Sequence, residues 1–173
     1  MHKIVIILIL SLLFPWSAMA KTPKAKPAIT FDDILGVVPI LSGFGTAATA
    51  TTVNRNILRG IQPDSVPWDA DTLRGSVTTT GMISLTVEAL RMEGGDGIGT
   101  SGQQKVFATL VCGAAAPFTL HSTAAAGVAL DLEGNVRITD ALVPAPPATC
   151  VSPLLLIRNL QGDWLAAGIV APK

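Results

Sequence analysis

The chain has 173 residues, with 12 Lys and Arg against 12 Asp and Glu, no Tyr and 49% apolar residues. This length and hydrophobicity suit one globular domain with a sizeable core. Because the charges balance, nothing in the composition favours nucleic acid or another acidic polymer as a partner.

The first 20 residues have the three parts of a secretory signal. His2-Lys3 is a short basic start, Ile4–Phe14 is uncharged and apolar, and Ala18-Met19-Ala20 places small residues before a cleavage point at Lys21. The apolar segment has 11 residues, whereas a membrane-spanning helix needs about 20. We therefore expect residues 1–20 to be removed, with an uncleaved anchor as the alternative, and no membrane span after cleavage.

Cleavage would leave 153 of the 173 residues, with 11 Lys and Arg against 12 Asp and Glu because Lys3 is removed. Residues 21–28 are basic, contain proline and are interpreted as a linker, and residues 29–173 as a single domain. Thr30 followed by Asp33 resembles a helix cap, so one short helix is expected over Phe31–Val38. Thr46–Asn56 has no clear period and gives no firm prediction.

From residue 60 onward, period-two patterns between turn residues predict short strands. Met82–Leu90 is the clearest, because Ile83, Leu85 and Val87 alternate with polar residues. The other expected strands are Thr72–Thr79, Lys105–Cys112, Phe118–Thr123, Val128–Leu132, one beginning at Val136, Leu154–Arg158 and Trp164–Val170. Together they predict an all-β fold, an antiparallel β-sandwich of about 7–9 short strands, with a closed β-barrel as the alternative.

Cys112 and Cys150 are the only cysteines and lie 38 residues apart. The first ends a predicted core strand and the second precedes another. Two thiols outside the cytoplasm usually oxidise to each other. We therefore predict that a disulfide ties the two strands, while a free buried pair and a redox couple are the competing interpretations. The C-x-x-C spacing that favours a redox couple is missing.

Three aspartates around Trp68, namely Asp64, Asp69 and Asp71, are candidate calcium ligands. Calcium takes six to eight oxygen ligands, so three loop aspartates would supply part of a site, and a solvated loop is the simpler interpretation. Gly97–Gly102 matches G-x-G-x-x-G, but a predicted strand follows it where a nucleotide site needs a helix. No cofactor is therefore expected.

His121 is the one histidine after the predicted cleavage point. A Ser–His–Asp hydrolase site would need it. Its candidate partners are Ser101, Ser122, Asp131 and Asp140. Because side chains alternate between the two faces of a strand, His121 shares a face with Thr119 and Thr123. That face looks exposed, so a surface histidine is the simpler interpretation.

A series of short motifs resembles a group of small exported bacterial proteins with two cysteines and no established activity. The motifs are Pro67-Trp68, Val87–Leu90, Phe107–Cys112, Cys150–Pro153 and Trp164–Ala167. The resemblance implies a bacterial source, a secreted β domain and the Cys112–Cys150 pair, and it brings no catalytic residues.

The sequence therefore predicts a secreted or periplasmic protein, a non-enzymatic binding or structural module of the envelope or the exterior. Its partner is expected to be a protein or another envelope component. We expect a binding surface in the end loops, such as Gln62–Asp71 or Glu93–Gln104. The alternatives are a small hydrolase using His121 and a calcium-binding module.

We predict that protein recovered from its native compartment begins at Lys21. Intact-mass analysis and N-terminal sequencing check this prediction directly. A chain that keeps residues 1–20 would contradict cleavage and favour the uncleaved anchor.

Overall fold

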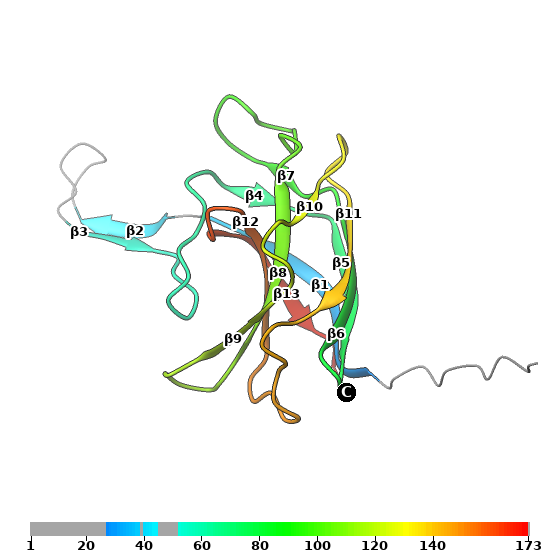
Figure 1. Cartoon of the computed structure of the whole chain (residues 1–173). Helices are drawn as coiled ribbons and strands as arrows, with labels where there is room; N and C mark the ends of the chain where they lie inside the picture. Colours follow the sequence, from blue (N-terminus) through cyan, green and yellow to red (C-terminus); the bar gives the residue numbers. More distant parts are fainter. Residues whose placement is uncertain (1–26, 39, 45–51, 173) are drawn as a thin grey trace, which may run out of the picture.

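A computed structural model describes residues 27–38, 40–44 and 52–172 (Figure 1). The predicted signal segment and most of the predicted linker lie outside these ranges. The described residues form thirteen strands. Over this part of the chain, no helix has the length and apolar character needed to cross a lipid bilayer.

The strands, in chain order, are β1 (Pro27–Gly36), β2 (Ile40–Phe44), β3 (Thr52–Arg55), β4 (Trp68–Asp69), β5 (Thr72–Thr78), β6 (Met82–Glu88), β7 (Arg91–Met92), β8 (Lys105–Cys112), β9 (Thr119–Ser122), β10 (Val128–Ala129), β11 (Val136–Ala141), β12 (Leu154–Asn159) and β13 (Trp164–Val170). The predicted all-β, antiparallel fold is confirmed. Two small sheets, β2–β3 and β4–β7, lie beside one large sheet.

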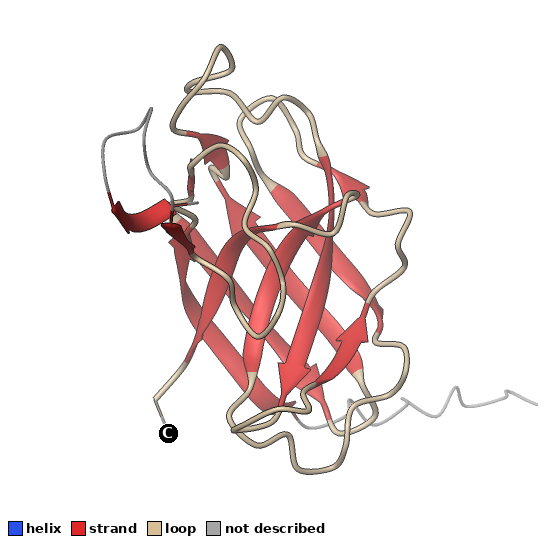
Figure 2. Ribbon diagram, turned by 90° about the vertical axis from the view of Figure 1, so that its left-hand side faces the viewer, coloured by secondary structure: helices blue, strands red, loops and turns tan. Residues whose placement is uncertain are grey.

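The large sheet has nine strands in the order β10-β8-β12-β13-β1-β5-β6-β11, with β9 also paired to β8. It curls until its two ends approach each other, so that strands form both a near and a far wall in Figure 2. At the seam β10 and β11 are in contact without strand pairing. Ser122, at the end of β9, and Val143, after β11, also exchange backbone hydrogen bonds of 3.1 and 2.8 Å. This nearly closed sheet is closer to the barrel alternative than to two separate layers.

The antiparallel pair β8 and β12 lies near one end of this strand order, and its register places Leu110 opposite Leu155. In β8 every residue after Lys105 is buried, and in β12 Leu155, Leu156 and Ile157 are fully buried. Because successive residues of a strand point to opposite faces, these three buried neighbours show that both faces of β12 are covered, which explains the uninterrupted run of apolar residues.

The predicted disulfide joins Cys112 at the end of β8 to Cys150 just before β12, with the two Cα atoms 5.1 Å apart. The Gly113 N–H donates to the Val151 carbonyl at 2.8 Å beside it. The two strands singled out in the sequence are therefore both paired and covalently tied, as predicted.

The helix expected over Phe31–Val38 is wrong, because these residues belong mostly to β1. The Asp33 carboxylate does accept a backbone hydrogen bond, from Ile34 at 2.8 Å, but it does so within a β-bulge. The bulge turns both Phe31 and Ile34 into the core, three residues apart, which imitates helical spacing. β1 also begins at Pro27, two residues inside the predicted linker.

We predict that Cys112→Ala/Cys150→Ala lowers the free energy of unfolding by about 4 kcal/mol, because the cross-link closes a loop of this length in the unfolded chain. Urea titration under non-reducing conditions measures the change. An unchanged midpoint would show that the cross-link contributes nothing to stability.

Candidate functional site

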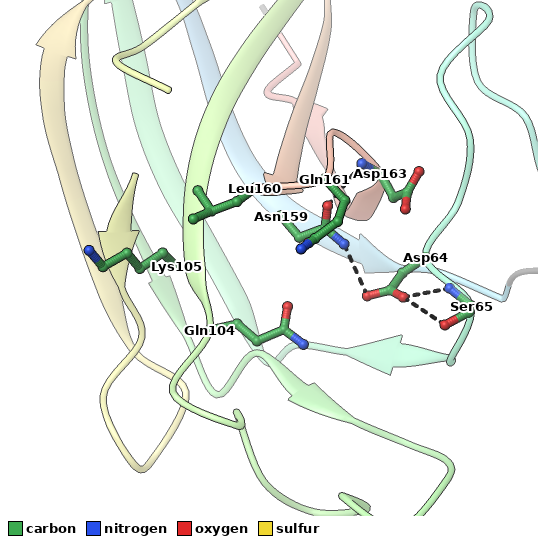
Figure 3. Close-up of a pocket in the computed structure, with 8 residues that line it drawn as sticks. All are labelled: Asp64, Ser65, Gln104, Lys105, Asn159, Leu160, Gln161 and Asp163. Atoms are coloured by element: carbon green, nitrogen blue, oxygen red, sulfur yellow. Dashed lines mark hydrogen bonds between the residues drawn. The ribbon is translucent and has the colours of Figure 1, made fainter. Parts of the chain in front are cut away.

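Several polar side chains line an open hollow of about 380 Å³ at one end of the large sheet (Figure 3). We call it the polar hollow. It is lined by Asp64, Ser65, Gln104, Lys105, Asn159, Leu160, Gln161 and Asp163. These residues come from three segments: the loop before β4, the start of β8 with the residue before it, and the turn between β12 and β13. The first two segments include residues of the loops in which a binding surface was predicted.

Backbone hydrogen bonds hold the loop before β4 against the start of β13. The Trp164 N–H donates to the Gln62 carbonyl at 2.9 Å, and the Asp64 N–H donates to the Trp164 carbonyl at 3.1 Å. The same loop meets the glycine-rich loop, because the Glu93 N–H donates to the Pro67 carbonyl at 2.8 Å and β4 pairs with β7. Main-chain contacts, which sequence periodicity does not reveal, therefore bring the segments together.

The floor of the polar hollow is a buried pair, Asp64 and Asn159, with exposed fractions of 8% and 4%. Asp64 Oδ2 accepts hydrogen bonds from Trp68 Nε1 at 3.0 Å and from Asn159 Nδ2 at 3.4 Å. Its Oδ1 accepts from the backbone N–H and the hydroxyl of Ser65. Asn159 Oδ1 in turn accepts from the Asp163 N–H at 2.9 Å. These bonds fix both side chains before any ligand arrives.

The rim carries side chains that are more open to solvent. Ser65, Lys105 and Gln161 are exposed, whereas Gln104 and Asp163 are half-buried. Two amides, a hydroxyl, an ammonium group and a carboxylate offer both hydrogen-bond donors and acceptors within one hollow. Such a set is suited to binding a polar ligand.

The three candidate calcium ligands lie in different places. Asp64 forms the floor of the polar hollow, whereas Asp69 and Asp71 are exposed and line another hollow with Arg91 and Glu93. Within the described ranges, no three His, Cys, Asp or Glu side chains are grouped so that they could hold a metal ion. The structure therefore does not bring the predicted calcium ligands together.

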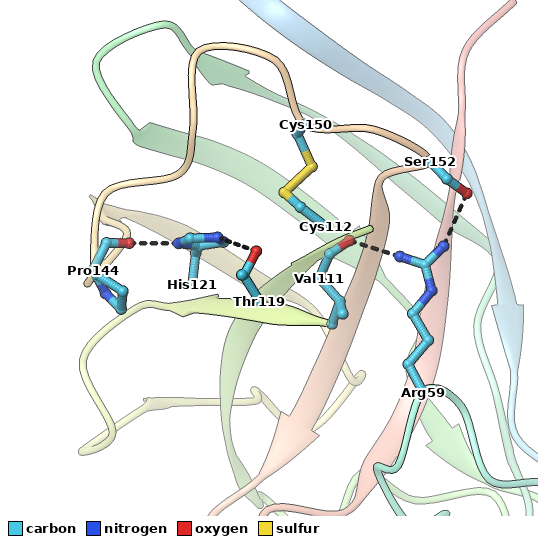
Figure 4. Close-up of a disulfide and its surroundings, with 8 residues drawn as sticks. All are labelled: Arg59, Val111, Cys112, Thr119, His121, Pro144, Cys150 and Ser152. Atoms are coloured by element: carbon cyan, nitrogen blue, oxygen red, sulfur yellow. Dashed lines mark hydrogen bonds between the residues drawn. A yellow bond between two sulfur atoms is a disulfide. The ribbon is translucent and has the colours of Figure 1, made fainter. Parts of the chain in front are cut away.

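His121 is 4% exposed, so the expectation of a surface histidine is wrong. Its Nδ1 lies 2.8 Å from the Pro144 carbonyl and its Nε2 lies 3.0 Å from the Thr119 hydroxyl (Figure 4). Because a carbonyl only accepts, Nδ1 is the donor, and in the neutral ring Nε2 accepts from the hydroxyl. The chain after β11 covers His121 on a face of β9 that looked exposed from the alternation of residues alone.

The candidate partners of His121 make their hydrogen bonds elsewhere. The Ser122 hydroxyl lies 2.9 Å from the Thr109 hydroxyl, and the Ser101 hydroxyl donates to the Asp131 carbonyl at 2.6 Å. Asp140 accepts from the Ala124 and Ala141 N–H groups. The Asn135 N–H donates to the Asp131 carboxylate at 2.7 Å and lowers the pKa of that carboxyl. The structure therefore places His121 in structural contacts and does not assemble the candidate triad.

The glycine-rich segment Gly97–Gly102 folds back on β7. The Gly99 N–H donates to the Met92 carbonyl, and the Met92 N–H donates to the Thr100 carbonyl at 2.9 Å. β8 begins three residues after this segment, as predicted, so no helix N-terminus faces it.

Comparisons of the chain with protein-family models, with curated proteins and with solved structures return no match. The resemblance to small exported bacterial proteins therefore rests on its short motifs alone.

We predict that Asp64→Ala lowers the free energy of unfolding by about 1–3 kcal/mol, because the Trp68 N–H and the Asn159 amide lose a buried acceptor. Asp71→Ala, the control, removes an exposed carboxylate and should change stability by less than about 0.5 kcal/mol. Urea unfolding followed by tryptophan fluorescence compares the two variants. Equal losses would show that Asp64 has no special role in the floor of the hollow.

Proposed function

We propose that the protein is an exported, non-enzymatic binding module that acts in the periplasm or outside the cell. The observation that carries this proposal is the convergence of three chain segments on the polar hollow, with the buried Asp64 and Asn159 side chains already fixed at its floor. A site whose groups are held in place loses little conformational entropy when a ligand binds.

Two observations support the exported location. The first 20 residues have the pattern of a secretory signal. The Cys112–Cys150 disulfide is of the kind that persists in oxidising compartments and is rare in the cytosol.

The side chains of the polar hollow indicate the chemistry of the partner. Two carboxylates, Asp64 and Asp163, outnumber the single ammonium group of Lys105, so the lining gives no attraction for an anion. Gln104, Asn159 and Gln161 carry amides that both donate and accept hydrogen bonds. We infer that the partner presents uncharged hydrogen-bonding groups, such as the backbone and amide side chains of an exposed polypeptide segment in the envelope.

A pull-down from envelope extract with immobilised protein tests the proposal. We expect Lys105→Glu/Gln161→Ala to reduce recovery of the specific partner by about tenfold, equivalent to roughly 1.4 kcal/mol. Arg137→Glu is the control, because Arg137 is exposed on β11 and is not among the residues lining the hollow. The control variant should recover the partner as the unchanged protein does.

Equal recovery by both variants, or no specific partner at all, would contradict the proposal. Turnover of an ester or peptide substrate that His121→Ala abolishes would favour the hydrolase alternative. Activity that survives His121→Ala would exclude a mechanism based on that residue.

A further inference from the structure

A second hollow, of about 350 Å³, lies at the opposite end of the large sheet from the polar hollow. Its walls are the start of β1, the ends of β5 and β13, and the loop between β11 and β12. We call it the apolar mouth. β13 links the two ends, because it starts beside the polar hollow at Trp164 and ends at the apolar mouth with Val170.

No residue that lines the apolar mouth carries a charge. The lining consists only of Ala, Ile, Val, Pro, Cys and Thr residues. Ile29 packs against the core and Val77 is almost fully buried, so the inner wall is continuous with the hydrophobic core. Threonine hydroxyls, such as those of Thr30 and Thr149, are the polar side-chain groups of the lining.

The loop that forms one wall of the apolar mouth is held at both of its ends. At one end Cys150 is tied to β8 through Cys112. At the other end Pro146 packs over the turn between β5 and β6, where a Cβ added to Gly81 would lie 2.8 Å from the Pro146 Cδ atom. The packing of Pro146 and the Cys112–Cys150 cross-link hold the wall in place without a ligand, which favours binding because less conformational freedom is lost.

We propose that the apolar mouth binds an uncharged, largely apolar small molecule. Its volume falls within the range of small-molecule sites in proteins, and barrel mouths are a common location for them. A ligand there would displace water that contacts mainly apolar walls, which is favourable. A charged ligand would lose its hydration without gaining an ionic partner.

A pair of matched dyes tests the proposal. N-phenyl-1-naphthylamine is neutral, and 8-anilinonaphthalene-1-sulfonate has the same ring systems with an added negative charge. We expect the neutral dye to bind with a stoichiometry of one, with a saturable rise in fluorescence. The sulfonate should bind at least about tenfold more weakly.

Two neighbouring residues on β13 supply the matched variants. Val170 lines the apolar mouth and is 40% exposed, whereas Ile169 does not line it and is 47% exposed. Val170→Lys should weaken binding of the neutral dye by about tenfold or more, and Ile169→Lys should leave it within about twofold. Thr149→Glu, a lining change in an exposed loop position, is the second test if Val170→Lys does not fold.

Lys105→Glu at the opposite end separates this proposal from the proposed function, because it should leave dye binding unchanged. The inference would be overturned by the absence of saturable binding to the unchanged protein, by equal affinity for both dyes, or by equal losses in the lining variant and Ile169→Lys.

Discussion

The pairing of β8 with β12, closed by the Cys112–Cys150 disulfide, is the interaction on which the rest of the structure depends. From β12 the sheet continues through β13, β1, β5, β6 and β11. On its other edge, β8 pairs with β9 and β10. Both strands are almost entirely buried, so hydrophobic burial and backbone hydrogen bonding act on the same residues. The disulfide adds a constraint on the unfolded chain at one end of the pair.

The antiparallel arrangement also separates two kinds of surface. At one end the loop before β4, the start of β8 and the β12–β13 turn supply amides, carboxylates and a lysine around the buried Asp64. At the other end the loop between β11 and β12 is cross-linked over strand ends that carry no charge. One scaffold can therefore present a hydrogen-bonding hollow and an uncharged one without interference, since the core lies between them.

Much of the fold was predictable, because the alternation of apolar and polar residues along a strand and the residues typical of turns are local signals in the sequence. Lys105–Cys112 and Trp164–Val170 were predicted with the bounds that β8 and β13 have, and the disulfide followed from the redox context. The features that were not predicted depend on contacts between residues far apart in the sequence. A bulge gave Phe31 and Ile34 helix-like spacing, and the chain after β11 buries His121. The loops predicted to carry a binding surface contribute Asp64, Ser65 and Gln104 to the polar hollow, whereas Asn159 was not singled out in the sequence, because only its contact with Asp64 reveals its role.

Native-state hydrogen exchange tests the central claim most directly. The amides of Leu155, Leu156 and Ile157 lie in a strand paired on both edges, so we predict that they exchange only through global unfolding. The amide of Thr139, in β11 at the seam, should exchange by local opening at a lower free energy. Exchange of the three β12 amides as fast as that of Thr139 would contradict the account, because the pair of β8 and β12 would then not be the most stable part of the sheet.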